Sequence, residues 1–129
     1  MPQTKIYGHT EFIQQHRETI SDSIHACTIE ALSYPPDKRF QRFISLADED
    51  FIYPGDRTKQ YLVIEISLFE GRSVAAKKNL MRLIYEKLNA ALNIAPNDIE
   101  IILYEVPPHN WGVRGVPGDE LNLNYKIQV

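Results

Sequence analysis

Two stretches of the chain, ALSYPP at Ala31–Pro36 and ALNIAP at Ala91–Pro96, repeat each other sixty positions apart. In each, an Ala-Leu pair is followed within a few residues by proline, which cannot continue a helix and is common just beyond a helix end. Each stretch follows a segment with helical spacing of apolar residues and precedes a run rich in β-branched and aromatic residues. The repeat therefore predicts two copies of one strand–helix–strand unit.

Two amphipathic helices are expected from the apolar residues that recur at steps of three, four or seven. The first is predicted over about 11–32 with Thr10 as its N-cap, and the second over 74–92, entered through Ser73. The expected core-facing residues are Ile13, Ile20, Ile24, Cys27 and Ala31 in the first helix and Val74, Met81, Ile84, Leu88, Ala91 and Leu92 in the second.

Strands are expected around these helices, in KIY at 5–7, FQRFISL at 40–46, YLVIEISLF at 61–69 and IEIILYEV at 99–106. The third run shows its two faces clearly. Leu62, Ile64, Ile66 and Leu68 share one face, and Val63, Glu65 and Ser67 share the other. One face should therefore pack against helices and the other should meet a more polar environment.

The predicted fold is a single α+β domain over 1–129, built from duplicated β-α-β units at about 2–46 and 61–106. Because parallel crossover connections are almost always right-handed, both helices should cover the same face of one four-stranded sheet. The opposite face would carry Ile102 and Tyr104, and we expect oligomer formation to cover it. The alternating residues 121–129 predict a short C-terminal strand that pairs with a neighbouring subunit's edge.

Composition excludes several classes of function. The net charge is −3 and the basic residues are scattered, so nucleic acid is a poor partner. The four histidines do not fall at metal-ligand spacing, and the longest apolar run is too short to cross a bilayer. The lone cysteine, Cys27, is expected to be an ordinary buried thiol. We therefore expect a soluble cytoplasmic protein without metal or cofactor.

The first residues, MPQTKIYG, place a proline directly after the initiator methionine. If Met1 is removed, Pro2 has a free secondary amine that can act as a general base or attack a carbonyl. If Met1 stays, the same nitrogen is an inert amide. A working amine would need a lowered pKa, which burial and neighbouring cations both favour.

Arginines are the natural companions of such an amine, because their paired N–H donors also bind a carboxylate or an enolate oxygen. Arg72 is a candidate at the junction of the third strand and the second helix, where helix N–H groups favour anions. On spacing alone, however, a solvated residue at a helix start is the more common outcome for Arg72. Arg114 and Trp111 lie in the glycine-containing segment NWGVRG, where Trp111 could form a substrate wall or pack in a core or interface.

Four segments together carry a resemblance to a known family: MPQTKIY, SIHACTIEALSYPPDKRFQ, the FEGRS turn and VPPHNWGVRG before a short terminal strand. In this order they resemble the tautomerase superfamily, specifically its longer-chain branch containing malonate semialdehyde decarboxylase. The resemblance covers essentially the whole chain. It implies a trimer whose unblocked N-terminal proline is catalytic. It also implies Pro2 as acid or base, Arg72 as ligand of the substrate anion, and Trp111 with Val113 as a hydrophobic wall.

The chain departs from the decarboxylase pattern at two places. The first arginine of the Arg-x-Arg pair before the second helix is replaced by Glu70, and Lys38 stands at the family's aspartate position with Asp37 displaced by one. Both changes weaken the decarboxylase and hydratase interpretations. Asp37 and His25, on the first helix, remain candidates for substrate binding, although a partly buried structural histidine is the default for His25.

The sequence thus predicts a cofactor-independent keto–enol tautomerase, a homotrimer, acting on a small anionic 2-oxo or 2-hydroxy-enoic acid. Two alternatives stay open. One is decarboxylation or hydration of a small acid on the same scaffold. The other is a catalytically silent trimeric binding protein, which a retained Met1 and Glu70 would favour.

Overall fold

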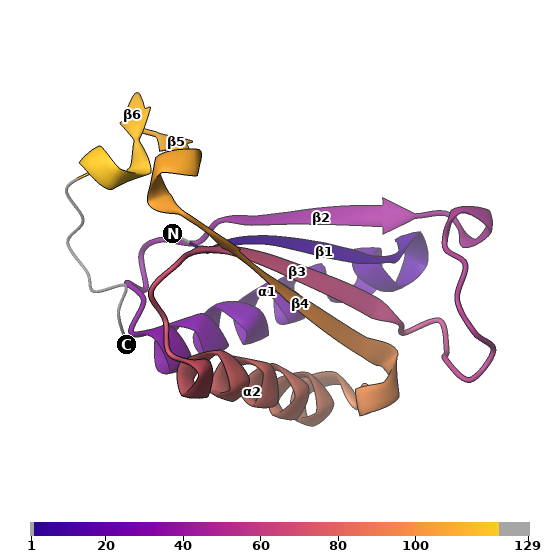
Figure 1. The fold of residues 1–129 in the computed structure, drawn as a ribbon. Helices are drawn as coiled ribbons and strands as arrows, with labels where there is room; N and C mark the ends of the chain where they lie inside the picture. Colours follow the sequence, from indigo (N-terminus) through magenta and orange to yellow (C-terminus); the bar gives the residue numbers. More distant parts are fainter. Residues whose placement is uncertain (1, 122–129) are drawn as a thin grey trace.

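The computed structural model describes residues 2–121, so the terminal strand predicted at 121–129 lies outside them except for Leu121. Its first four strands and two helices are, in chain order, β1 (Gln3–His9), α1 (Thr10–Leu32), β2 (Gln41–Leu46), β3 (Leu62–Phe69), α2 (Val74–Leu92) and β4 (Ile99–Val106). Both helices lie on one side of the sheet (Figure 1). The α+β architecture expected from the sequence is confirmed.

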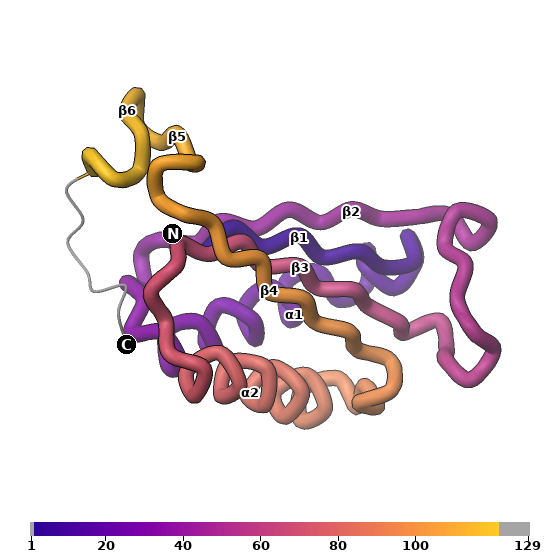
Figure 2. The backbone as a smooth tube through the Cα atoms, viewed as in Figure 1, coloured from indigo at the N-terminus to yellow at the C-terminus, as the bar shows by residue number. Residues whose placement is uncertain are grey.

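The strand order is β2-β1-β3-β4. β1 pairs in parallel with β2, and β3 pairs in parallel with β4, so each β-α-β unit contributes one parallel pair. The two units join through the antiparallel contact of β1 with β3, in which Ile6 lies opposite Ile64. As Figure 2 shows, the two units therefore run in opposite directions along the sheet.

The sixty-residue repeat has a counterpart in the backbone. Ser33 and Asn93 end α1 and α2 in the left-handed conformation, with φ of 52° and 56°. Leu46 and Val106, also sixty positions apart, are the last residues of β2 and β4. Each helix thus stops in the same way before the chain turns into its second strand.

The core lies between the sheet and the helices. The alternation predicted for β3 is confirmed, because Leu62, Ile64, Ile66 and Leu68 are fully buried. The predicted stripe of α2 needs correction at its ends, since Val74 and Ala91 are exposed and Leu80 takes a core position instead. The buried residues of α1 include Ile13, Ile20, Ile24 and Cys27, and those of α2 are Leu80, Ile84 and Leu88.

Neither helix covers the other sheet face (Figure 1). Ile102 and Tyr104 are 37% and 46% exposed there. They lie beside Glu65, whose carboxylate accepts a hydrogen bond from Tyr104 at 3.4 Å and pairs with Lys5 at 3.5 Å. We refer to this surface as the open face.

Thr10 is not the N-cap that the sequence suggested. Helix α1 begins at Thr10 and its N-cap is His9, which makes no side-chain capping bond. The His9 ring is instead buried between Asp48, 2.8 Å from Nδ1, and the Tyr53 hydroxyl, 2.5 Å from Nε2. This contact ties the end of β1 to the long connection between the two units.

Alkaline pH should destabilise the protein through Cys27. Burial raises the pKa of this thiol from 9.0 to about 11. Between these values the unfolded chain loses the proton first, so it binds fewer protons than the folded chain and stability falls as pH rises. We expect a loss on the order of 1 to 3 kcal/mol from pH 9 to pH 11. Urea unfolding across this range should show a smaller loss of unfolding free energy for Cys27→Ala than for the wild type. The loss that remains comes from Tyr61 and Tyr85, whose pKa values burial also raises and which both proteins contain. Equal slopes would contradict the prediction.

No helix within residues 2–121 has the length and apolar character needed to span a membrane.

Candidate active site

The sheet topology brings the predicted site residues to one end of the molecule. β1 and β2 begin at this end, whereas β3 and β4, which run the opposite way, finish there. Pro2 precedes β1, Asp37 precedes β2, Arg72 follows β3 and Trp111 follows β4. Figure 1 shows the N-terminus and the segment after β4 at this same end.

Pro2 is buried at the start of β1. The neighbouring backbone is fixed by a hydrogen bond of 3.0 Å from the Thr4 N–H to the Phe40 carbonyl, just before β2. The Pro2 ring therefore lies next to backbone that this hydrogen bond holds in place.

Arg72 is only 5% exposed. Its Nη1 lies 3.4 Å from the carbonyl oxygen of Phe69, the last residue of β3. The next residue, Ser73, caps α2 by accepting a bond of 3.1 Å from the Ala76 N–H. Sequence spacing favoured a solvated helix-start residue, whereas the structure encloses this guanidinium near the helix N-terminus.

Trp111 packs edge-on against the fully buried Phe69, with ring centroids 4.9 Å apart. Its backbone is held on both sides, because its N–H donates to Pro108 and its carbonyl accepts from Gly118 at 2.7 Å. Phe69 thus contacts both Trp111 and Arg72, and links the segment after β4 to the start of α2.

A small hairpin, which the sequence did not predict, follows Trp111. Strands β5 (Gly112–Val113) and β6 (Val116–Pro117) pair antiparallel. The two turn residues, Arg114 and Gly115, have φ of 54° and 83°, the positive values typical of a tight two-residue hairpin turn. Arg114 is therefore an exposed arginine at the tip of the hairpin.

Two adjoining cavities lie against this segment, and they share Asn110, Trp111 and Gly112 as lining. The first, about 520 Å³, also contains Val113 and Arg114. The second, about 470 Å³, opens toward the sheet and is lined by residues from all four long strands or their ends: Gln3, Arg42, Ser67 and Val106. Arg72 lines neither cavity.

His25 and Asp37 form a separate group at the end of α1. The His25 ring is buried, and its Nε2 lies 2.7 Å from the Pro36 carbonyl oxygen, so it fastens α1 to the turn that carries Asp37. Asp37 is exposed beside it. Neither residue lines the two cavities around Trp111.

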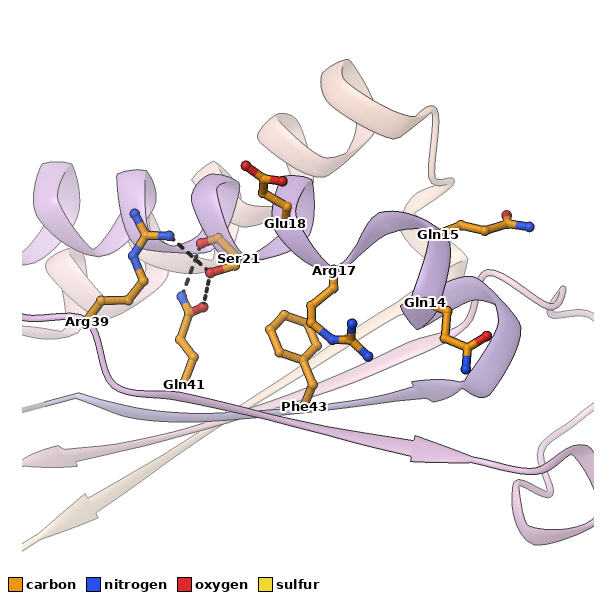
Figure 3. A pocket seen from close by; sticks show the side chains of 8 residues that line it. All are labelled: Gln14, Gln15, Arg17, Glu18, Ser21, Arg39, Gln41 and Phe43. Atoms are coloured by element: carbon orange, nitrogen blue, oxygen red, sulfur yellow. Dashed lines mark hydrogen bonds between the residues drawn. The ribbon is translucent and has the colours of Figure 1, made fainter.

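Another hollow, about 600 Å³, lies elsewhere, between α1 and the edge strand β2 (Figure 3). Arg39 donates there to Asp22 at 2.6 Å and to Ser21, which also donates to Gln41. None of the predicted site residues lines this hollow. Within residues 2–121, moreover, no cluster of three or more histidine, cysteine or acidic side chains is placed to hold a metal ion.

Sequence reasoning missed two residues at this end, Phe69 and Arg42. Phe69 lies inside an apolar strand run and has no signal that distinguishes it from other core residues. Arg42 could have been found, because the alternation of β2 places it with Ile44 on the face away from the helices.

Replacing Gly118 with alanine should distort the Trp111 segment. The added Cβ would lie 2.6 Å from the Pro108 carbonyl oxygen and 2.8 Å from the Phe69 ring. We expect a cost of about 1 to 3 kcal/mol, because the backbone must shift. The matched control is Gly55→Ala, whose Cβ meets nothing within 4 Å. Urea unfolding and the emission of Trp111, the only tryptophan, would report the change. Equal stabilities of the two variants would contradict the packing described here.

Comparison with known proteins gives relatives along most of the chain. "Probable tautomerase YusQ" of Bacillus subtilis (strain 168) is 25% identical over 116 residues, which cover 86% of this chain and 91% of the relative. "Probable tautomerase RSp0893" of Ralstonia nicotianae is 36% identical over 55 residues, covering 43% of this chain and 79% of the relative. A 2-hydroxymuconate tautomerase of Pseudomonas putida is 28% identical over 60 residues, covering 46% of this chain and 95% of the relative.

Solved structures share the fold. FG41 malonate semialdehyde decarboxylase inhibited by 3-bromopropiolate superposes with a TM-score of 0.77 at 24% identity, covering 85% of this chain and 87% of that one. A fused 4-OT described as an asymmetric trimer gives a TM-score of 0.81 at 18% identity, covering 91% and 96%. The profile of the family described as "Tautomerase enzyme" matches residues 38–114, well over half of the chain. On this match and on the fold, the chain belongs to the tautomerase family.

Proposed function

We propose that the protein is a cofactor-independent keto–enol tautomerase of small 2-oxo or 2-hydroxy-enoic acids, with Pro2 as its general base once Met1 is removed. The observation that carries the proposal is the position of Pro2. It is buried at the sheet end where the Trp111 segment and its two cavities lie, in a chain of the tautomerase family.

The reaction needs only one proton carrier. The neutral Pro2 nitrogen accepts the proton of the substrate's 2-hydroxyl group, the carbon–oxygen double bond forms, and the carbon–carbon double bond shifts. The same nitrogen then returns the proton to carbon, so no proton, electron or co-reactant is gained or lost overall. Burial of Pro2 disfavours its ammonium form and so favours the neutral base.

The remaining candidates take supporting roles in this proposal. Arg114 lines a cavity with Trp111 and can pair with the substrate carboxylate, while Trp111 and Val113 form an apolar wall. Arg72 lines neither cavity, so in this proposal its positive charge acts on the developing enolate from a distance, from its enclosed place at the start of α2. His25 and Asp37 lie outside the two cavities, and in this proposal the contact of His25 with the Pro36 carbonyl fixes the turn that carries Asp37.

The proposed assembly is a homotrimer. A fused 4-OT with the same fold is described as an asymmetric trimer, and here the open face exposes Ile102 and Tyr104. Exposed apolar residues on an uncovered sheet face are typical of a surface that another subunit covers.

The test is turnover of phenylenolpyruvate, a small enol acid, by protein whose N-terminus has been identified as Pro2 by intact mass. We expect ketonisation, followed by the loss of the enol absorbance, at a rate well above the uncatalysed one. Absence of turnover by protein with a free Pro2 would contradict the proposed function. Incubation with malonate semialdehyde distinguishes the decarboxylase alternative, since only that activity releases carbon dioxide.

A further inference from the structure

A polar stripe of α1 lies across from the edge strand β2 at the hollow shown in Figure 3. Gln14, Arg17 and Ser21 recur at the three- and four-residue steps that place side chains on one face of a helix. From β2, Gln41 and Phe43 point to the same side of the sheet because they are two positions apart. The volume between them, about 600 Å³, falls within the range of roughly 300 to 1,000 Å³ in which pockets hold small organic molecules.

One end of the hollow is already satisfied by hydrogen bonds within the protein. Arg39 donates to Asp22 at 2.6 Å and to the Ser21 hydroxyl at 3.1 Å. The side chain of Gln41 accepts a bond from the Ser21 hydroxyl and donates to the Ser21 carbonyl at 3.1 Å. The charge of Arg39 is therefore neutralised by Asp22, and these side chains form a polar wall.

Arg17 differs from Arg39, because its side chain makes no ion pair or hydrogen bond with the part of the chain that the structure describes, 2–121. It is exposed, and in Figure 3 it points from α1 toward β2. Its neighbour Glu18 also lines the hollow but points away from the strand. Phe43 packs against the core and is only partly buried, so the rest of its ring faces the hollow. An uncompensated guanidinium and an apolar ring thus line the same hollow.

The second β-α-β unit shows what the first one lacks at this place. Adding sixty positions takes Arg17 to Lys77 on α2, and Ser45 on β2 to Glu105 on β4. Lys77 donates to the Glu105 carboxylate at 2.7 Å, so the strand neutralises the helix cation in the second unit. In the first unit, the Ser45 hydroxyl has no charge to offer Arg17. Equivalent positions of the fold therefore hold a paired cation in one unit and an available cation in the other.

We propose that this hollow is a binding site for a small organic anion with a flat apolar group, such as an aromatic carboxylate. Arg17 pairs with the carboxylate through two N–H donors, and Phe43 packs against the ring of the ligand. Gln14, which points toward β2 in Figure 3, adds an amide donor. The hollow shares no lining residue with the two cavities beside Trp111, so the site goes beyond the proposed tautomerase reaction and does not depend on it.

Titration with 2-naphthoate, a flat aromatic carboxylate, followed by two-dimensional amide NMR tests the proposal, because the spectrum shows where the ligand lies. Amide signals of residues 14–21 and 39–45 should shift in a saturable manner. The matched ligand is 2-naphthamide, which has the same rings without the charge. It should bind about tenfold more weakly, as expected when a charge-assisted pair is lost.

Two variants remove the available cation in different ways. Arg17→Gln deletes the charge, and Ser45→Glu supplies the carboxylate that the second unit has at this position. Each should weaken 2-naphthoate about tenfold and leave 2-naphthamide unchanged. The controls are Arg82→Gln, at an exposed position of α2, and Ser45→Gln, which adds the same bulk without the charge. Both controls should bind 2-naphthoate as the wild type does, and circular dichroism of each variant checks the fold.

Absence of saturable shifts in these two segments, equal affinity for the two ligands, or full binding of 2-naphthoate by Arg17→Gln would overturn the inference. So would shifts confined to residues 109–117, because the ligand would then occupy the cavities beside Trp111. Turnover of phenylenolpyruvate by Arg17→Gln should equal that of the wild type, and its loss would assign Arg17 to the reaction instead. Failure of the binding test alone leaves the proposed tautomerase reaction standing.

Discussion

Keeping the Pro2 nitrogen in a peptide bond should lower kcat/KM for phenylenolpyruvate by about 10²- to 10⁴-fold, the usual contribution of a general base. An acylated nitrogen has no lone pair free to accept a proton, and Pro2 is buried, so water cannot readily replace it. The measurement compares protein with a short N-terminal extension before and after a protease removes the extension to expose Pro2. Full activity of the extended protein would exclude the amine mechanism.

The pH profile of the processed protein provides an independent check. The base must be neutral, so kcat/KM should fall as pH decreases through the pKa of the amine. Because burial disfavours the charged form, we expect this fall to be centred below about 7.7, the ordinary value for an α-amino group. Pro2→Ala should lower the rate throughout this range, and a Pro2→Ala variant as active as the wild type would contradict the assignment.

A charge on the open face should break the assembly. Ile102 is 37% exposed on this face, and in a trimer its side chain would be covered by another subunit. In Ile102→Glu, each interface would bury a carboxylate without a partner, which costs several kcal/mol. We expect the variant to elute as a monomer at micromolar concentration in size-exclusion chromatography with light scattering.

The matched control is Ile52→Glu. Ile52 is 91% exposed in the connection between the two units, so the same substitution there should leave the assembly and the unfolding transition unchanged. A trimeric Ile102→Glu protein, or a wild type that is already monomeric, would show that the open face is not a subunit interface.

The regular part of the fold could be predicted because its signals are local. Alternation in the run from Tyr61 to Phe69 identified the buried face of β3, and the spacing of the Ala-Leu pairs indicated where α1 and α2 end. The position of both helices on one face of the sheet then followed from the handedness of crossover connections. These signals depend on periodicity and on proline, both of which are visible in the sequence itself.

The site was less predictable, because its details depend on contacts between distant segments. The edge-on packing of Trp111 against Phe69 joins the last residue of β3 to the segment after β4, and no pattern in the sequence predicts this contact. Strands β5 and β6 have two residues each, too few to show alternation, so the sequence does not predict the hairpin. Spacing alone favours a solvated Arg72, because it shows neither the burial of this side chain nor its contact with the Phe69 carbonyl.

The antiparallel contact between β1 and β3 determines how many amine sites the assembly could contain. Two separate half-length chains would each bring a terminus, one to either end of the sheet. In the joined chain, Leu62 opens the second unit in the middle of the polypeptide, so its nitrogen is an amide. A trimer would accordingly hold three amines, all at the same end of its subunits. At the opposite end, where His9 bridges Asp48 and Tyr53, the proposed mechanism would then have no terminal amine.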